Sequence, residues 1–175
     1  MHIKVHGTPA SQGSKTRGAN GQMREASKAL PAWREAIRAE TQREIQRWHG
    51  GKVAFTGAVE VSVELMLPRP RGHWRTRGGE IVDELKPDAP AYPIGKPDGD
   101  KLLRAVMDGI TAGGALADDS IAVRQYVTKD YALFGQPAGC DVWIDPLRPA
   151  GKFTVSDPAR EAIAAARASG AILGR

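Results

Sequence analysis

The sequence predicts a single small α+β domain in which a mixed β-sheet packs against helices, followed by a C-terminal helical tail. Two patterns carry this prediction. Apolar side chains in residues 31–48 recur at the spacing of one helical face, whereas residues 59–67 alternate apolar and polar side chains as a half-buried strand does. The chain has 175 residues, 41% of them hydrophobic, which suits one core and is cramped for two. We expect the main domain to span residues 1–146 and an extension with a short helix to follow over residues 147–175.

The first third of the chain contains one strand, one loop and one helix in our interpretation. Alternation over residues 3–7 predicts a short strand with one exposed face. Residues 8–28 are rich in Gly, Ser, Asn and basic side chains, so we expect a mobile loop without an element. The helix over residues 31–48 is amphipathic and ends at a pair of glycines. Its periodicity favours a core position for Trp33 and Trp48, although an exposed tryptophan could also stack on a base.

The middle of the chain begins with the clearest strand. We place it over residues 53–67, where Pro68 ends it. The arginine-rich residues 69–80 are interpreted as a basic loop that forms no regular element, and it is either a DNA-contacting arm or simply solvated. We expect His73 in this loop to be solvated rather than a metal ligand. Residues 83–97 carry four prolines and predict an extended segment.

The last part of the chain begins with a second helix. It is predicted over residues 100–111, with Asp100 capping its first turn and a glycine pair ending it. Two more strands follow, one beginning at Ile121 and one over residues 139–144. The segment Ser156-Asp-Pro has the signature of a helix start and predicts a small amphipathic helix in the tail.

The composition restricts the class of protein. The net charge of +5 and the pI of about 9.6 favour a polyanionic partner, with nucleic acid the leading candidate. Cys140 is the only cysteine, which excludes a disulfide framework and fits a reducing compartment; we expect it to be a small buried residue. The sequence has no apolar run of signal-peptide or membrane-span length, so we expect a cytoplasmic protein without a membrane partner.

Four carboxylates flank the second helix. Asp98 and Asp100 stand at its start, and Asp118 and Asp119 follow the turn beyond its end. The helix is about 16 Å long, and the residues after it can span that distance in reverse, so Asp119 can return beside the first two acids. Carboxylate oxygens are the ligands that Mg²⁺ takes in proteins. An acid cluster on a basic chain therefore suggests metal-assisted chemistry on a polyanion.

The alternative to metal binding is a purely structural role for these acids. Acids at a helix start can cap it and interact with its dipole, which would account for one or two of them. A calcium-binding EF-hand is excluded, because Leu102 and Gly109 occupy positions where that loop needs ligands. We expect Asp108, two turns beyond Asp100, to be structural.

The acids belong to two motifs that carry a resemblance. The first is Lys96-Pro-Asp98-Gly-Asp100-Lys-Leu-Leu-Arg104-Ala-Val-Met-Asp108-Gly-Ile, and the second is Asp118-Asp119-Ser-Ile-Ala-Val. Together they resemble the RusA family of Holliday-junction resolvases, which are endodeoxyribonucleases of bacteria and prophages. The family pattern is D-x-D-N-L-x-K-x-x-x-D-x-L followed by D-D-x-x-V, and the order and spacing of its acids match. The resemblance is strong over residues 96–131 and agrees elsewhere only in the order of elements.

The resemblance implies a function in DNA recombination and repair. It implies a Mg²⁺-dependent homodimer, with Mn²⁺ as a substitute metal, that binds four-way junctions and cuts two opposed strands symmetrically. The RusA-like nuclease domain would occupy residues 1–146 and act in the cytoplasm of a bacterium or of a phage-infected host. The essential carboxylates fall on Asp98, Asp100 and Asp119, with Asp118 as an adjacent metal-ligand candidate.

Two positions depart from the family pattern. Lys101 stands where the family commonly has asparagine, and Arg104 stands where it has a lysine. Either cation could stabilise charge that develops on the scissile phosphate, and the sequence does not choose between them.

Basic side chains outside these motifs are candidates for DNA contacts. They lie in the two predicted loops and just before the acids, where guanidinium and ammonium groups could pair with phosphates and an indole could stack or wedge. The candidates are Lys15, Arg17, Arg24, Arg69, Arg71, Trp74, Arg75, Arg77 and Lys96.

The sequence leaves three other functions open. One is a nuclease for flaps, forks or other branched DNA. Another is a non-catalytic binder of junctions or single strands, in which the acids only cap a helix. The third is a basic protein with a structural cation.

Overall fold

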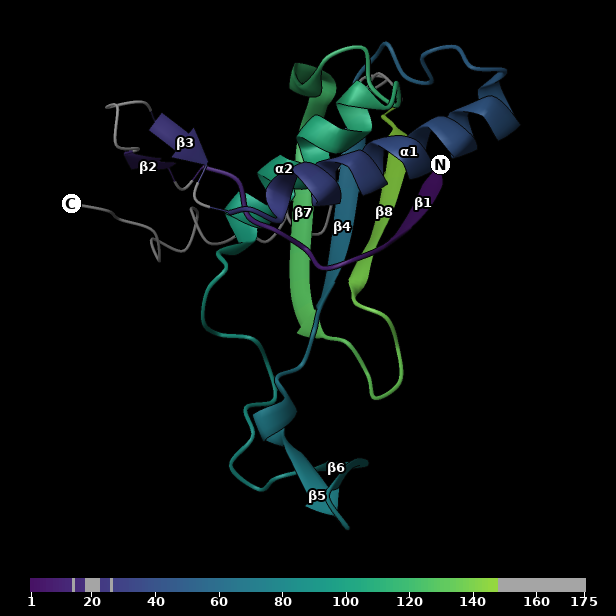
Figure 1. Cartoon of the computed structure of the whole chain (residues 1–175). Helices are drawn as coiled ribbons and strands as arrows, with labels where there is room; N and C mark the ends of the chain where they lie inside the picture. The colour runs from purple at the N-terminus through teal and green to yellow at the C-terminus, as the bar shows by residue number, and fades with distance from the viewer. Residues whose placement is uncertain (14, 18–22, 26, 148–175) are drawn as a thin grey trace, which may run out of the picture.

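The protein is a mixed four-stranded sheet with two helices on one of its faces (Figure 1). The computed structural model describes residues 1–13, 15–17, 23–25 and 27–147. The strand order is β1-β8-β4-β7, in which only β4 and β7 are parallel. This confirms the predicted α+β class. The strands of the sheet are β1 (His2–His6), β4 (Val59–Leu67), β7 (Ala122–Tyr131) and β8 (Gly139–Pro146).

The two helices confirm the periodic patterns. Helix α1 spans Leu30–His49 and buries Trp33 and Ile37 against the sheet side. Helix α2 spans Gly99–Ala112 and is followed by a glycine pair, as predicted. The core position predicted for Trp48 is wrong, because 69% of this residue is exposed. It lies in the last turn of α1, where its indole N–H donates to Glu44 Oε2 at 3.0 Å.

Apolar and polar residues alternate along the central strands, which places the apolar side chains on the face that the helices cover. Every second residue of β4 from Val59 to Leu67 is buried, and Val142 and Ile144 of β8 are fully buried beside them. Cys140 is also buried, as expected, and burial together with the nearby Asp141 carboxylate raises the pKa of its thiol to about 12. A thiol in this state is inert and serves as a small apolar residue.

The two helices pack against each other at two glycines, one within α2 and one directly after its last residue. Gly109 and Gly113 are four residues apart, and they face Ile37 and Thr41, which have the same spacing on α1. A β-carbon built on Gly113 would come within 3.0 Å of the Arg38 carbonyl oxygen and closer still to Thr41. The Thr41 hydroxyl donates to the Ile37 carbonyl at 2.7 Å, so its methyl group is free to pack. The backbone of α2 therefore lies directly on α1.

Two segments that were predicted to be loops without regular elements each contain strands of a β-hairpin, so both predictions are wrong. Within residues 8–28, β2 (Lys15–Arg17) pairs with β3 (Met23–Glu25). Residues 69–80 are not irregular: a 3-10 turn, η1 (Arg71–His73), leads into β5 (Trp74–Arg77), which pairs with β6 (Glu80–Leu85). The turn between them is Gly78-Gly79, with φ of 59° and 87°, values that glycine adopts without strain and that close a two-residue hairpin.

We call this second hairpin, Trp74–Leu85, the arm. It projects past the end of β4 and β7 (Figure 1). His73 at its base is half-buried and meets the Tyr131 ring edge-on at 5.5 Å, so the expectation that it is solvated is also wrong.

The remaining boundaries differ in small ways. Strand β4 begins at Val59 rather than at residue 53, and Phe55 instead forms an isolated parallel bridge with Leu116. The tail helix predicted at Ser156 and the end of the predicted extension lie outside the described residues. Within the described part of the chain, neither helix combines the length and apolarity that crossing a membrane requires.

The close contact between the helices makes a direct prediction. Gly113→Ala adds a methyl group where Thr41 and a backbone carbonyl already lie, so it should lower the free energy of unfolding by about 1–3 kcal/mol. The matched control is Gly57→Ala, whose added methyl group meets no atom within 4 Å. Urea unfolding of both variants measures the effect, and equal stability of the two would contradict the packing described above.

Candidate active site

Helix α2 presents two of the predicted acids at its start. Asp98 is the N-cap residue in an extended conformation, and its carbonyl accepts from the Leu102 N–H at 3.1 Å. The cap position predicted for Asp100 is wrong, since this residue lies within the first turn. The Asp98 side chain makes no capping hydrogen bond to the helix. Its carboxylate is therefore directed to other partners.

The partner of Asp98 is a lysine one turn along α2. Lys101 Nζ lies 2.8 Å from Asp98 Oδ2, and both side chains are partly exposed. The hydrogen bond from Lys101 lowers the pKa of Asp98, and the charges of Lys96 and Lys129 act in the same direction. The same pair raises the pKa of Lys101. Both groups are thus held in their charged forms at neutral pH.

The other two acids stand on the turn that leads into β7. Asp118 is the N-cap of a 3-10 turn, η2 (Asp119–Ile121), and its carboxylate accepts from the Ser120 N–H at 2.9 Å. Hydrogen bonds from Ser120 lower the pKa of Asp118. Asp119 is exposed. The turn contacts α2, but the start of this helix lies beside Val127 of β7, whereas Asp118 and Asp119 precede the first residue of β7, so the structure does not bring the two pairs of acids together.

Backbone hydrogen bonds fix the path from α2 to this turn. The N–H groups of Ala54 and Phe55 donate to the carbonyls of Gly114 and Ala115, at 3.1 and 3.0 Å. The Ala117 N–H donates back to Phe55 at 2.9 Å. The chain after α2 is thereby held by an isolated parallel bridge immediately before the acids.

The four carboxylates do not form a closed metal site. Within the described residues, no group of three or more His, Cys, Asp or Glu side chains is arranged to hold a metal ion. The return of Asp119 to the acids of α2 therefore stays a prediction. Arg104 is exposed on the next turn of α2, and its Nη1 lies 3.3 Å from where a β-carbon on Gly13 would be.

The segment before Asp98 is held by a residue that the sequence interpretation missed. Lys129 on β7 donates to the carbonyls of Gly95 at 2.8 Å and Pro97 at 3.0 Å. An alternating strand gives no sign of such a contact, because it joins residues more than 30 positions apart. Lys129 is a positioning residue, since it holds the backbone that presents Asp98.

The N-terminal loop closes the other side of the same segment. The Gln12 N–H donates to the Lys101 carbonyl at 3.0 Å, which docks the loop on the first turn of α2. Ser11 then lines a pocket of about 270 Å³ together with Lys96, Asp98 and Lys101. The loop thus brings a hydroxyl group next to the acids, another feature that the sequence did not reveal.

The arm uses several of the predicted DNA-contacting arginines for its own structure. Arg75 and Arg77 both pair with Glu84, at 3.0 and 2.7 Å. Arg69 lies with its guanidinium carbon 4.2 Å from the centre of the Tyr131 ring. Arg71 is exposed. The arm is therefore a folded hairpin with internal ion pairs rather than a solvated loop.

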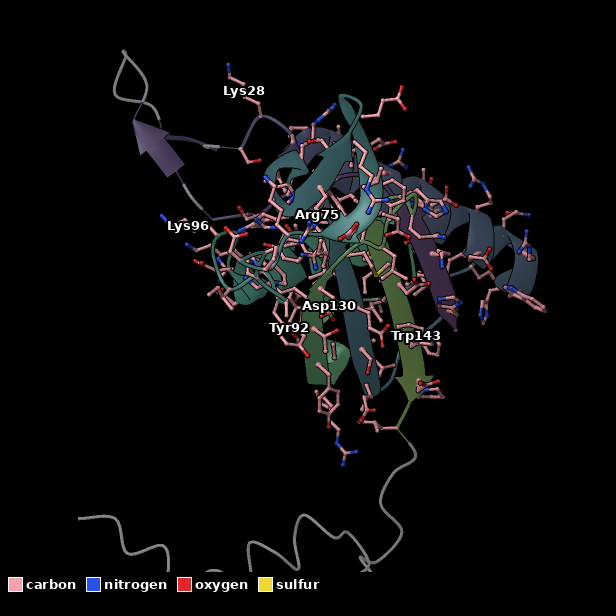
Figure 2. All side chains as sticks on the ribbon, turned by 90° about the horizontal axis from the view of Figure 1, so that it is seen from below. Lys28, Arg75, Tyr92, Lys96, Asp130 and Trp143 are labelled. Carbon is pink, nitrogen blue, oxygen red and sulfur yellow. The ribbon has the colours of Figure 1, made fainter. Side chains whose placement is uncertain are left out.

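The other predicted contacts lie apart from the arm. Lys15 and Arg17 belong to β2, and Arg24 belongs to β3. Lys96 is exposed, and Figure 2 shows its side chain, like that of Lys28, extending away from the body of the molecule.

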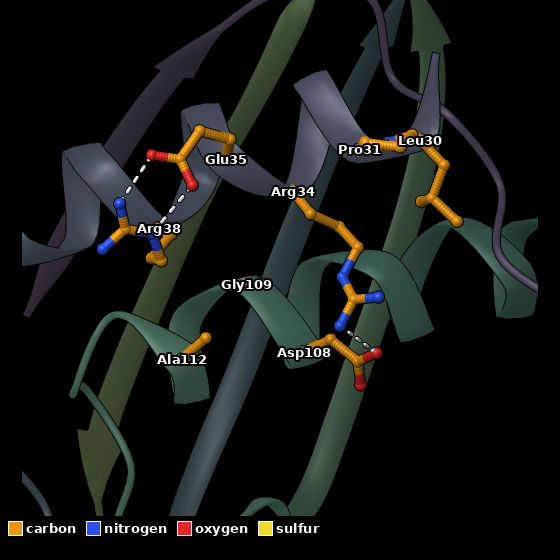
Figure 3. Close-up of a pocket in the computed structure, with 8 residues that line it drawn as sticks. All are labelled: Leu30, Pro31, Arg34, Glu35, Arg38, Asp108, Gly109 and Ala112. Carbon is orange, nitrogen blue, oxygen red and sulfur yellow. Dashed lines mark hydrogen bonds and ion pairs between the residues drawn. The ribbon is translucent and has the colours of Figure 1, made fainter. Parts of the chain in front are cut away.

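Asp108 lies outside this acid cluster, in a pocket of about 340 Å³ between the helices (Figure 3). It pairs with Arg34 of α1 at 2.9 Å, while Arg38 and Glu35 pair with each other beside it. This ion pair ties α2 to α1, which agrees with the structural role expected for Asp108.

The comparison with protein families decides the identity. Residues 6–137 match the family described as Endodeoxyribonuclease RusA. The chain belongs to this family. It is accordingly an endodeoxyribonuclease of the RusA type, a family that acts on Holliday junctions and generally depends on divalent metals. A comparison with curated proteins gave no match.

The RusA match contains all the candidate residues described above. It begins at the end of β1, includes the arm, both groups of acids and Lys129, and stops just before β8. The non-catalytic binder and the basic protein with a structural cation are therefore set aside.

Lys129 allows a test of how the RusA-type site is held. Lys129→Met removes both hydrogen bonds to the segment before Asp98, so amide exchange should rise there and cleavage should fall by about tenfold. Lys129→Arg should retain part of the activity, because its guanidinium can donate to the same carbonyls. Arg124→Met on the same strand, which removes a long contact with Glu60 at 3.5 Å, is the control. Unchanged exchange and cleavage in Lys129→Met would refute the positioning role.

Proposed function

We propose that the protein resolves four-way DNA junctions by paired, symmetric, Mg²⁺-dependent phosphodiester hydrolysis at Asp98, Asp100 and Asp119. The observation that supports this most is the placement of the acids. Asp98 and Asp100 stand at the start of α2, where Lys96, Lys101 and Lys129 act on Asp98, and Asp118 and Asp119 stand at η2, which contacts the same helix. Asp118, next to Asp119, is the neighbouring carboxylate of the same site.

The donor set suits a hard divalent cation. All four candidates are carboxylates, and the pKa values of Asp98 and Asp118 are lowered by hydrogen bonds, so both are ionised at neutral pH. Mg²⁺ is commonly held by a few carboxylates, water and substrate phosphate, and Mn²⁺ accepts similar oxygen ligands. When bound, the metal supplies positive charge at the phosphate and lowers the pKa of water.

The chain's own cations have separate roles in this proposal. Lys101 pairs with Asp98 and keeps that carboxylate ionised and in place. Arg104 is exposed on the following turn of α2. We assign Arg104 to the phosphate, where its planar guanidinium can bind two oxygens and stabilise charge that develops during cleavage.

Symmetric resolution requires two copies of this site. A four-way junction needs matched cuts in two opposed strands, and a two-fold homodimer supplies them by repeating one site across its axis. The basic residues of β2, β3 and the arm would hold the junction arms through phosphates. Because such contacts release counterions, junction binding should weaken steeply with salt.

Substitution of the acids tests the chemistry. Asp98→Asn and Asp100→Asn should each reduce cleavage of a synthetic four-way junction by roughly a hundredfold or more while junction binding persists, because a carboxamide is a poor ligand for Mg²⁺. Asp108→Asn, on the same helix but paired with Arg34, is the control and should cleave like the wild type. The assay compares a junction, a flap, a fork and a linear duplex with Mg²⁺, with Mn²⁺ and with neither. Full activity of Asp98→Asn would contradict the site, and preferential cutting of flaps or forks would contradict the junction specificity.

A further inference from the structure

A pocket of about 560 Å³ lies at the foot of the arm, against the end of β7 and the loop that follows it. This is within the range of sites that bind small flat molecules. We call it the arm pocket. Its main walls are Arg69, Trp74, Leu85, Tyr131, Leu133 and Phe134.

The aromatic walls of the arm pocket are held in fixed positions. Arg69 donates to the carbonyls of Pro90 at 3.0 Å and Ala91 at 3.2 Å while it covers the Tyr131 ring. The rings of Trp74 and Phe134 meet nearly edge-on, with centroids 5.1 Å apart. The pocket is thus preformed and needs little side-chain ordering to accept a ligand, which lowers the cost of binding.

The pocket combines exposed apolar side chains with nearby arginines. Phe134 is 41% exposed and Leu133 76% exposed. Arg69 lines the pocket and the exposed Arg71 lies at the base of the arm, while Arg75 and Arg77 of β5 are paired with Glu84. Aromatic platforms beside cationic side chains are the composition with which proteins bind single-stranded nucleic acid, because each base has a face to stack and each phosphate a charge to pair.

Polar groups at the pocket edge suit a base better than a purely apolar partner. Asp83 and Gln136 also line the pocket. A carboxylate accepts hydrogen bonds, and an amide both accepts and donates them, so together they can bond to the edge of a base.

The arm pocket lies close to the start of α2, and so to Asp98, along one strand. Lys129, which holds the backbone before Asp98, and Tyr131, which lies under Arg69, are two residues apart on β7. Residues at this spacing face the same side of a strand and lie roughly 6.5 Å apart. A DNA strand bound at the acids would therefore pass the pocket.

We propose that the arm pocket takes one unstacked nucleobase from the strand that is cut. The branch point of a junction is where bases most easily leave the stack, since strands pass between helices there and stacking between the arms is interrupted. The bound base would determine which phosphate of the strand lies at the acids. This inference rests on the proposed function and adds a base-binding site to it.

An abasic scan of the junction tests the pocket. Single abasic positions are placed along each strand near the branch point, and wild-type binding is measured by fluorescence anisotropy with EDTA present, so that no strand is cut. One position should weaken binding by about tenfold or more, the loss expected for one stacked base. In Phe134→Ala, affinity for the intact junction should fall by a similar factor, and the abasic position should have no further effect.

Trp48→Ala is the matched control, since it removes an exposed aromatic side chain from the end of α1 and should leave the scan unchanged. Should Phe134→Ala fail to fold in a thermal melt, the wild-type scan alone decides. Equal binding at every abasic position would overturn the pocket while leaving the proposed function intact. A change of oligomeric state in Phe134→Ala with an unaltered scan would assign this surface to contacts between copies and would also overturn it. Failure to bind any branched DNA would instead contradict the proposed function.

Discussion

The direct backbone contact between the two helices is the constraint on which the site depends. Gly109 and Gly113 let α2 lie on Ile37 and Thr41, and Leu102 and Ile110, fully buried, fix its rotation over the sheet. A helix packed in this way has one orientation, because interiors are close-packed and tolerate little displacement. Its start, and with it the first pair of acids, is thereby fixed beside β7, which α2 contacts.

The site is then completed by contacts that do not belong to the core. Lys129 holds the backbone before Asp98, and the bridge between Phe55 and Leu116 holds the chain before Asp118. Both contacts act on backbone carbonyls or N–H groups rather than on the acids themselves. The carboxylates consequently stay accessible, as a metal ion and a phosphate require, while the segments that carry them are restrained.

The sequence predicted those parts of the molecule whose signal is periodic or local. The helix at Leu30–His49, the long strand β4 and the helix at Gly99–Ala112 follow from side-chain spacing, because burial of one face imposes that spacing. The arm was missed because its arginines suggested solvation, whereas the Gly78-Gly79 turn determines the hairpin. Trp48 was wrongly predicted to lie in the core. The spacing of apolar residues shows which face of a helix is buried, but it does not show at which residue the helix extends beyond the sheet. Contacts over long sequence separation, such as that of Lys129, leave no local pattern.

The central claim is that acids from two separate segments bind one divalent metal. Titration of Mn²⁺ into the protein, followed by electron paramagnetic resonance, measures this without any DNA. If the claim is right, Asp98→Asn and Asp119→Asn each weaken Mn²⁺ binding by about tenfold or more, since each removes a ligand, while Asp108→Asn binds like the wild type. Wild-type Mn²⁺ affinity in Asp119→Asn would show that the turn contributes no ligand and would contradict the account.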